Sequence, residues 1–374
     1  MACADNLGLS LPFPLPFRFT FKSFRQFSMR FPASTPNPSR IEAYSINVTA
    51  SSVSVSSAND IFGWDDVLRI SQSEISPDDS SNLRGYFEKV QLCNRRSDLQ
   101  SEFLPFVIEN QIVGYIHMGF AVLLRSFKDV FIFPKDDSFG GRFGYYVTLD
   151  SKLATAEKRT SAVGDVVKSL GEEWIPGIRN ELFPVTTSFG APILFSLERA
   201  AAPYFGVQGY ATNLNGYVER DGQKYLWVAK RSQLKPTYPG RLDHLVAGGM
   251  PHGIACRENL VKECKEEAGI PRYISNKAIA VGAVSFLDID GYSYNRYVLF
   301  CYDLKLSESF EPKNEDGEVE SFKLIPAIQV ADVVRKTQFF TPNCALVIID
   351  FMFRHGYISP EYVGYLELLR SLRN

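Results

Sequence analysis

Three glutamates lie close together near the end of a short segment with helical spacing. They are Glu263, Glu266 and Glu267, in the stretch "GGMPHGIACRENLVKECKEEAGIP" that runs from 248 to 271. At roughly 100° per residue, a helix over 256–268 buries one side and places these glutamates along its border. The end of a helix is the negative pole of its dipole, where each misplaced acid costs roughly 0.3–1 kcal/mol. The crowding of acids there therefore needs a reason.

A divalent cation is one such reason. Mg²⁺ and Mn²⁺ prefer oxygen ligands, and a bound cation would reverse the sign of the local electrostatics. The alternative is a solvated helix face on which Glu258 pairs with Lys262 and Lys262 with Glu266. That alternative leaves Glu263 and Glu267 unexplained, but the spacing alone leaves both interpretations open.

The ends of the segment fit a helix that is entered from a glycine loop. Gly248, Gly249 and Gly253 precede the helix, where backbone without side chains could approach a phosphate closely; turns explain the same glycines equally well. After the helix, Gly269 suits the left-handed residue and Pro271 prevents continuation. The helix is therefore expected to end at 268.

The segment resembles the Nudix box, usually written G-x5-E-x7-R-E-U-x-E-E-x-G-U, where U is a bulky apolar residue. The matching positions are Gly248, Glu263, Cys264, Glu266, Glu267, Gly269 and Ile270. Two positions depart, because Ile254 stands where the first Glu is expected and Lys262 replaces the Arg. Lysine keeps the charge but loses planar two-pronged hydrogen bonding, so the glutamates would be held less rigidly.

The resemblance implies a metal-dependent enzyme that hydrolyses phosphoanhydride bonds. Glu263, Glu266 and Glu267 would bind Mg²⁺ or Mn²⁺, with Glu267 the leading ligand, and Lys262 would complete the catalytic set. Gly248, Gly249 and Gly253 would be the cofactor-binding loop, while the general base stays open. A non-catalytic Nudix-like binding module is the competing interpretation, although such modules are expected to lose metal acids.

Further residues are weaker candidates for the same site. Glu318 and Glu320, which alternate with an apolar residue, should face the same way on a strand, and either could add a metal ligand or simply be solvated. His244 and His252 flank the glycine loop and could contact phosphate or serve as polar turn residues. A basic patch could meet a diphosphate or consist of solvated strand ends; its members are Lys230, Arg231 and Lys235.

Other stretches narrow the resemblance to one branch of the family. "ERAAAPYFG", "NGYV", "LWVAKRS" and "PGRLDHLVAGGMPHGI" look like plant plastid Nudix hydrolases that carry an extra N-terminal domain. The two-part arrangement is similar to the Nudix half of fungal thiamine pyrophosphokinase fusion proteins. This implies a thiamine diphosphate-like substrate, in oxidised or damaged form, converted to the monophosphate. The alternative is a nucleoside diphosphate derivative such as ADP-ribose or NADH.

The expected fold is α+β. The resemblance implies a Nudix fold over 203–374, with a mixed β-sheet sandwiched between helices, and a smaller α+β domain over 59–202 that recognises the substrate. The alternating runs around Asp221-Gly222 predict a hairpin. Near the C-terminus, one helix should run from Pro342 to Gly356 and the last should begin at Pro360.

The first 58 residues have the composition of a disordered organelle transit peptide, which predicts a chloroplast location. Serine and proline are frequent, and the charged residues are Asp5 and Glu42 against Arg18, Lys22, Arg25, Arg30 and Arg40. A disordered tail without an address is the alternative.

Overall charge and cysteine usage exclude several other classes of function. The chain has 374 residues with 40 basic and 42 acidic side chains, so it offers no electrostatic reason for a nucleic acid or membrane partner. The 6 cysteines are scattered and form no metal motif. A small-molecule diphosphate is therefore the expected partner, and a homodimer is left open.

Overall fold

The computed structural model describes residues 62–72, 82–141 and 144–373. Contacts divide the chain into Met1–Ala58 and Asn59–Asn374, and the second unit contains all of the described residues. The predicted transit peptide lies outside them. Among the described residues, no helix is both long and apolar enough to cross a membrane.

The first half of the described chain contains a small sheet with strand order β2-β1-β4-β3. Its strands are β1 (Phe103–Ile108), β2 (Gln111–His117), β3 (Phe131–Ile132) and β4 (Val147–Leu149). Helices α4 (Met118–Leu124) and α5 (Ala156–Trp174) and the hairpin β5 (Leu182–Val185) with β6 (Phe195–Glu198) complete this part. A single buried core joins these elements, centred on Phe106, Phe120, Phe195 and Phe205.

The second half forms a sheet whose main path is β11-β12-β7-β8-β13. The strands are β7 (Gln208–Arg220), β8 (Gln223–Arg231), β11 (Ile279–Asp290), β12 (Ser293–Lys305) and β13 (Val319–Pro326). β7 and β8 pair only near their turn, from Tyr217 to Leu226. Farther along, β10 (Val246–Gly249) pairs with β7, while β9 (Leu242–Asp243) pairs with β8. The strand that leads into the glutamate helix therefore lies in an opening of the sheet.

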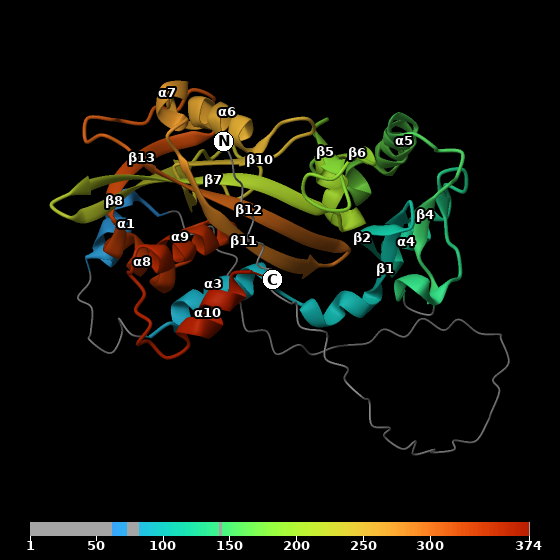
Figure 1. Ribbon diagram of the computed structural model, residues 1–374, viewed down its shortest axis with the longest axis horizontal. Helices are drawn as coiled ribbons and strands as arrows, with labels where there is room; N and C mark the ends of the chain where they lie inside the picture. Colours follow the sequence, from blue (N-terminus) through green and yellow to red (C-terminus); the bar gives the residue numbers. More distant parts are fainter. Residues whose placement is uncertain (1–61, 73–81, 142–143, 374) are drawn as a thin grey trace, which may run out of the picture. The chain divides into compact units, whose positions relative to one another are not determined.

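Helices cover both faces of this sheet, as Figure 1 shows. On one face lie α6 (Cys256–Ala268) and α7 (Arg272–Ser275), with Leu260 and Cys264 fully buried against the sheet. On the other lie α8 (Ala327–Lys336) and α9 (Pro342–Arg354), packed through Val330 and Leu346. The predicted α+β class and the sheet between helices are confirmed.

Two helices from the beginning of the described chain join the core under the second sheet. They are α1 (Trp64–Ser71) and α3 (Arg84–Cys93), and they share a buried cluster with α8 and α9 through Val67, Tyr86 and Val90. The two halves of the chain are thus interleaved. The predicted division between 202 and 203 stays a prediction.

Near the C-terminus, one predicted helix is confirmed and the predicted start of the last helix is wrong. The helix from Pro342 and its stop at Gly356, whose φ is 73°, are confirmed, whereas α8 was not predicted. The last helix, α10 (Tyr365–Ser371), does not begin at Pro360. The reason is Gly364, whose φ of 89° is left-handed and interrupts any helix between Pro360 and Tyr365.

Candidate functional site

The helix α6 has the ends that its sequence predicts. Gly269 has a φ of 62°, and the N–H of Ile270 donates to the Cys264 carbonyl at 2.9 Å, which closes the helix. The loop between β12 and β13 also hydrogen-bonds to this end of the helix. The N–H of Lys313 donates to the Ala268 carbonyl, and the N–H of Glu315 donates to the Glu266 carbonyl. These bonds bring the beginning of β13 close to the glutamates.

Strand β10 fixes the glutamates from the other side. The Glu267 carboxylate accepts a hydrogen bond from the Ala247 N–H at 2.8 Å. Gly248 leaves room for Glu263, because a β-carbon placed on Gly248 would stand only 2.3 Å from the Glu263 Cδ. The buried amide of Asn259 donates to the Gly248 carbonyl at 3.3 Å, which ties α6 to this strand.

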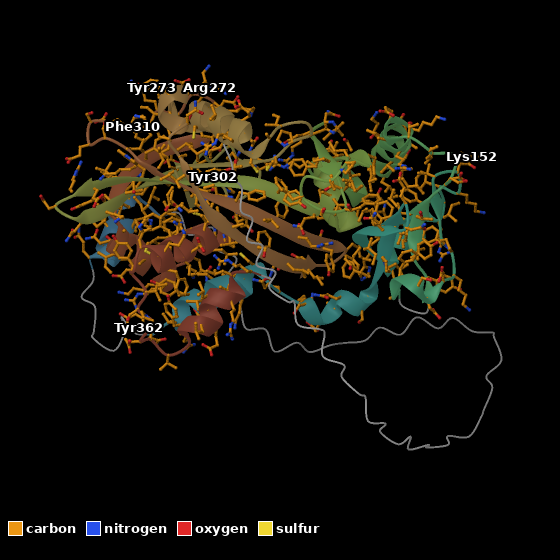
Figure 2. All side chains as sticks on the ribbon, in the orientation of Figure 1. Lys152, Arg272, Tyr273, Tyr302, Phe310 and Tyr362 are labelled. Carbon is orange, nitrogen blue, oxygen red and sulfur yellow. The ribbon has the colours of Figure 1, made fainter. Side chains whose placement is uncertain are left out.

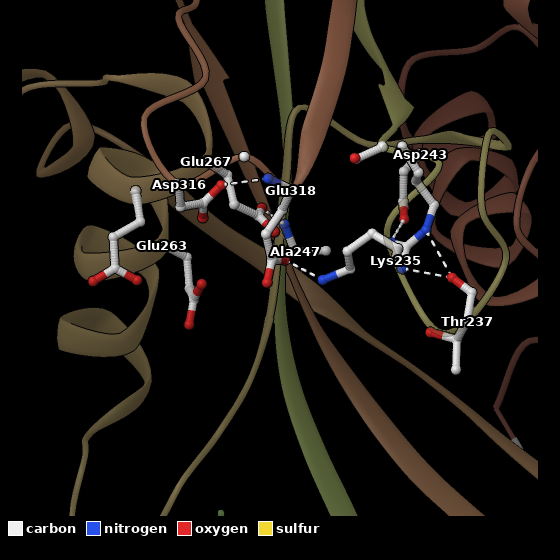
Figure 3. A network of polar contacts seen from close by, with 12 residues as sticks. Lys235, Thr237, Asp243, Ala247, Glu263, Glu267, Asp316 and Glu318 are labelled. Carbon is white, nitrogen blue, oxygen red and sulfur yellow. Dashed lines mark hydrogen bonds and ion pairs between the residues drawn. The ribbon is translucent and has the colours of Figure 1, made fainter. Parts of the chain in front are cut away.

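Glu263, Glu267 and Glu318 converge on one region, and Figure 3 shows them with Asp316. Glu267 is 9% exposed. Burial raises its pKa well above the usual value, and the charges of Glu263, Asp243 and Glu318 add to this. Burial also raises the pKa of Glu263, although Lys262 opposes the shift. Several carboxylates thus share a site in which each disfavours the ionisation of the others.

The donor set fits a hard divalent cation. Oxygen atoms of clustered carboxylates are the ligands that Mg²⁺ and Mn²⁺ prefer, and two positive charges would offset the repulsion among the acids. Next to Glu267 and Glu318 is a small cavity of about 10 Å³, roughly the room that one water molecule needs. A larger hollow of about 570 Å³ lies elsewhere, between Tyr217 and His355, and none of these glutamates lines it.

Glu266 and Lys262 lie on the outer side of the cluster. The Lys262 Nζ stands 2.7 Å from a Glu266 oxygen and 3.2 Å from a Glu263 oxygen, so it joins the more exposed glutamate to the less exposed one. The side chain of Glu266 is 44% exposed. The alternative pair between Glu258 and Lys262 is absent, because Glu258 instead accepts from Arg272 on α7, at the upper edge of Figure 2.

The three glycines of the loop differ in their surroundings. Gly248 lies against Glu263, and Gly249 lies against Phe183 and Arg199 of the first half of the chain. Gly253 has a φ of 83° and no atom near the position of a β-carbon, so it serves the turn. The structure therefore brings Gly248 to the glutamates, places Gly249 beside Arg199 and leaves Gly253 apart.

The expectation that Glu318 and Glu320 face the same way is wrong. Glu318 contacts Lys235 beside the box glutamates, whereas Glu320 accepts a bond from Lys230 at 3.1 Å. The pairing of β13 with β8 shifts register between Val319 and Ser321, so Glu320 is the extra residue of a bulge. Only Glu318 joins the cluster.

The remaining basic and histidine candidates have mostly structural partners. Arg231 donates to Asp243 at 2.8 Å, and Lys235 is the member of the basic patch that contacts Glu318. The side chain of His244 is fully buried next to Asp243, so it is an interior residue. His252 stands 2.6 Å from the Ser196 hydroxyl and thereby joins the glycine loop to β6.

Known proteins are similar to both parts of the chain. Residues 85–209 match a domain of unknown function (DUF4743), and residues 210–342 match the NUDIX domain. The NUDIX domain of Shewanella oneidensis NrtR, solved with ADP ribose, is 15% identical with a TM-score of 0.32, and the match covers 40% of this chain and 90% of that one.

Two plant relatives match most of the chain. Nudix hydrolase 20, chloroplastic, from Arabidopsis thaliana is 62% identical over 87% of this chain and 86% of its own length. Nudix hydrolase 24, chloroplastic, from the same plant is 60% identical over 84% of each chain. The predicted chloroplast location agrees with both names. The chain belongs to the Nudix hydrolases, enzymes that hydrolyse phosphoanhydride bonds with the help of divalent metal ions.

Proposed function

We propose that the chain hydrolyses an organic diphosphate to a monophosphate and phosphate, with Mg²⁺ or Mn²⁺ bound by Glu263, Glu266 and Glu267. The observation that carries the proposal is the convergence of Glu263 and Glu267 with Glu318 at the opening of the sheet. We add Glu318 to the ligand set. Glu266, on the exposed side, would meet the metal together with the substrate.

The residues around the cluster have distinct tasks in this proposal. The bound metal would neutralise the diphosphate and activate the attacking water. Lys262 holds Glu263 and Glu266 in a common orientation. Gly248 keeps the space in which Glu263 lies, while Gly249 offers bare backbone to a phosphate; we retain Gly253 as the turn that allows the loop to do so.

For the substrate we propose a thiamine diphosphate-like compound in oxidised or damaged form. The support is the resemblance to the Nudix half of the fungal thiamine pyrophosphokinase fusions, which covers both parts of the chain.

We further propose the division into a transit peptide (1–58), a substrate-recognition domain (59–202) and a Nudix domain (203–374). In support, β5 contacts the glycine loop, since the N–H of His252 donates to the Leu182 carbonyl at 3.1 Å.

A panel of diphosphates tests the proposal. Thiamine diphosphate, its oxidised derivatives, ADP-ribose and NADH are incubated with the wild type and with Glu267→Gln, in Mg²⁺ or Mn²⁺, and released phosphate or monophosphate is measured. The variant should lose about a thousandfold in kcat, because a neutral amide is a poor metal ligand; this corresponds to roughly 4 kcal/mol. Glu320→Gln serves as the control.

The outcomes separate the alternatives. Turnover confined to the oxidised thiamine compounds supports the proposed substrate. A preference for ADP-ribose or NADH would instead show that the substrate is a nucleoside diphosphate derivative. Equal rates for Glu267→Gln and wild type would remove Glu267 from the metal site. If neither protein hydrolyses any of the compounds, the result favours the alternative that the chain is a non-catalytic Nudix-like binding module.

A further inference from the structure

One arginine from the first half of the chain lies against the glycine pair of the Nudix box. Arg199 follows β6 and begins the short helix η4 (Arg199–Phe205). Its Cζ and Nη2 atoms lie 3.6 Å from the position that a β-carbon on Gly249 would occupy. The neighbouring Gly248 lies against Glu263. Because consecutive strand residues point to opposite faces, Arg199 and Glu263 approach β10 from its two faces.

The guanidinium is held in place by its own half of the chain. Its Nη1 donates to a Glu181 oxygen at 2.8 Å, and its Cζ lies 5.2 Å from the ring centre of Phe183. The N–H of Arg199 donates to the Glu181 carbonyl, which fixes the backbone as well. With 35% of the side chain exposed, Arg199 is neither buried in a core nor free in solvent.

The electrostatic surroundings of Arg199 connect it to the acid cluster. Burial disfavours the positive charge of the Arg199 guanidinium. Glu181 and, more weakly, Glu318 stabilise that charge, so that the pKa of Arg199 is raised. Glu318 in turn acts on Glu263 and Glu267. A planar guanidinium can keep one nitrogen on a carboxylate and present another to a phosphate oxygen, which is a geometry that lysine lacks.

We propose that Arg199 binds a phosphate oxygen of the substrate's diphosphate, with Glu181 as the residue that positions it. The first half of the chain then supplies part of the binding site, and the NUDIX domain alone is incomplete. This inference rests on the proposed function for the identity of the ligand. It assigns to Arg199 a task that none of the box glutamates performs, because their carboxylates attract metal and repel phosphate.

The test compares Arg199→Gln and Arg199→Lys with the wild type in steady-state hydrolysis. Arg199→Gln should raise KM about 10- to 100-fold, as expected for the loss of a hydrogen bond to a charged group, with a smaller change in kcat. Arg199→Lys should recover part of the loss. Arg125→Gln is the matched control, since Arg125 also lies over an aromatic ring, that of Phe133, in the same half of the chain.

A second measurement does not depend on turnover. Inorganic pyrophosphate with Mn²⁺ should raise the Tm of the wild type and of Arg125→Gln, but not that of Arg199→Gln, while Mn²⁺ alone should raise all three equally. If the wild type hydrolyses no diphosphate, the proposed function fails, yet loss of the pyrophosphate shift in Arg199→Gln still supports the anion site. An unchanged KM together with an unchanged pyrophosphate shift in Arg199→Gln would overturn the inference.

Discussion

Glu263 lies directly against the backbone of Gly248, so that a β-carbon on Gly248 would stand 2.3 Å from the Glu263 Cδ and 2.6 Å from its Oε1. Real β-carbons are not found this close to other atoms, so Glu263 can hold this position only with a glycine at 248. Gly248 does not have a positive φ, and its need for glycine therefore comes from this contact and not from the backbone.

Gly248→Ala should consequently displace Glu263 while the strand remains intact. We expect kcat to fall about 10- to 100-fold and the free energy of unfolding to change by less than about 1 kcal/mol, since a flexible side chain can move aside. Gly164→Ala, inside α5 with no atom within 4 Å of the new β-carbon, is the control for handling. Full activity in Gly248→Ala would show that the position of Glu263 is not critical.

Glu318 and Glu320 offer a matched pair of substitutions two residues apart. Glu318→Gln should lower kcat about 10- to 1,000-fold, because it removes one charge from the metal cluster. Glu320→Gln should stay within about twofold of the wild type in rate, and it should lose about 1–3 kcal/mol of stability because its partner Lys230 is largely buried. Steady-state rates and urea unfolding of both variants test this prediction. Equal losses of activity in the two variants would refute the assignment of Glu318 as a metal ligand.

The part of the site that depends on local sequence was predictable. The bounds of α6, its left-handed end at Gly269 and the border position of the glutamates follow from periodicity and capping within one short segment. The same holds for the hairpin at Asp221, where both central residues have positive φ.

Residues that reach the site from distant segments were not predictable in this way. Glu318 arrives because the loop before it bonds to the end of α6 and because a bulge at Glu320 turns the following strand. Arg199 arrives through packing between the two halves of the chain, for which a single sequence gives no signal beyond the quoted "ERAAAPYFG". Tertiary contacts decide both positions.

Lys262 replaces the arginine of the usual box and still contacts both neighbouring glutamates. Lys262→Arg should therefore retain activity within about threefold, since a guanidinium can make the same two contacts. Lys262→Met should lose about tenfold, corresponding to roughly 1.4 kcal/mol. Lys265→Met, an exposed lysine on the same helix, is the control, and initial rates at saturating Mg²⁺ provide the comparison. A tenfold loss in Lys265→Met as well would point to a general effect of helix charge.

Metal binding should depend on pH through Glu267, whose pKa burial and the neighbouring acids raise above 4.5. The folded metal-free protein keeps this proton when the unfolded chain has lost it. The stability that Glu267 contributes to the metal-free protein is thus complete below about pH 4.5 and declines as the pH rises through the pKa of Glu267 in the folded state. Mg²⁺ binds the ionised form, so the increase in Tm that Mg²⁺ produces should grow as the pH rises above 4.5 and through the raised pKa of Glu267. Thermal unfolding with and without Mg²⁺ measures this, and Glu267→Gln should remove most of the pH dependence; a constant increase in the wild type would contradict the role of Glu267.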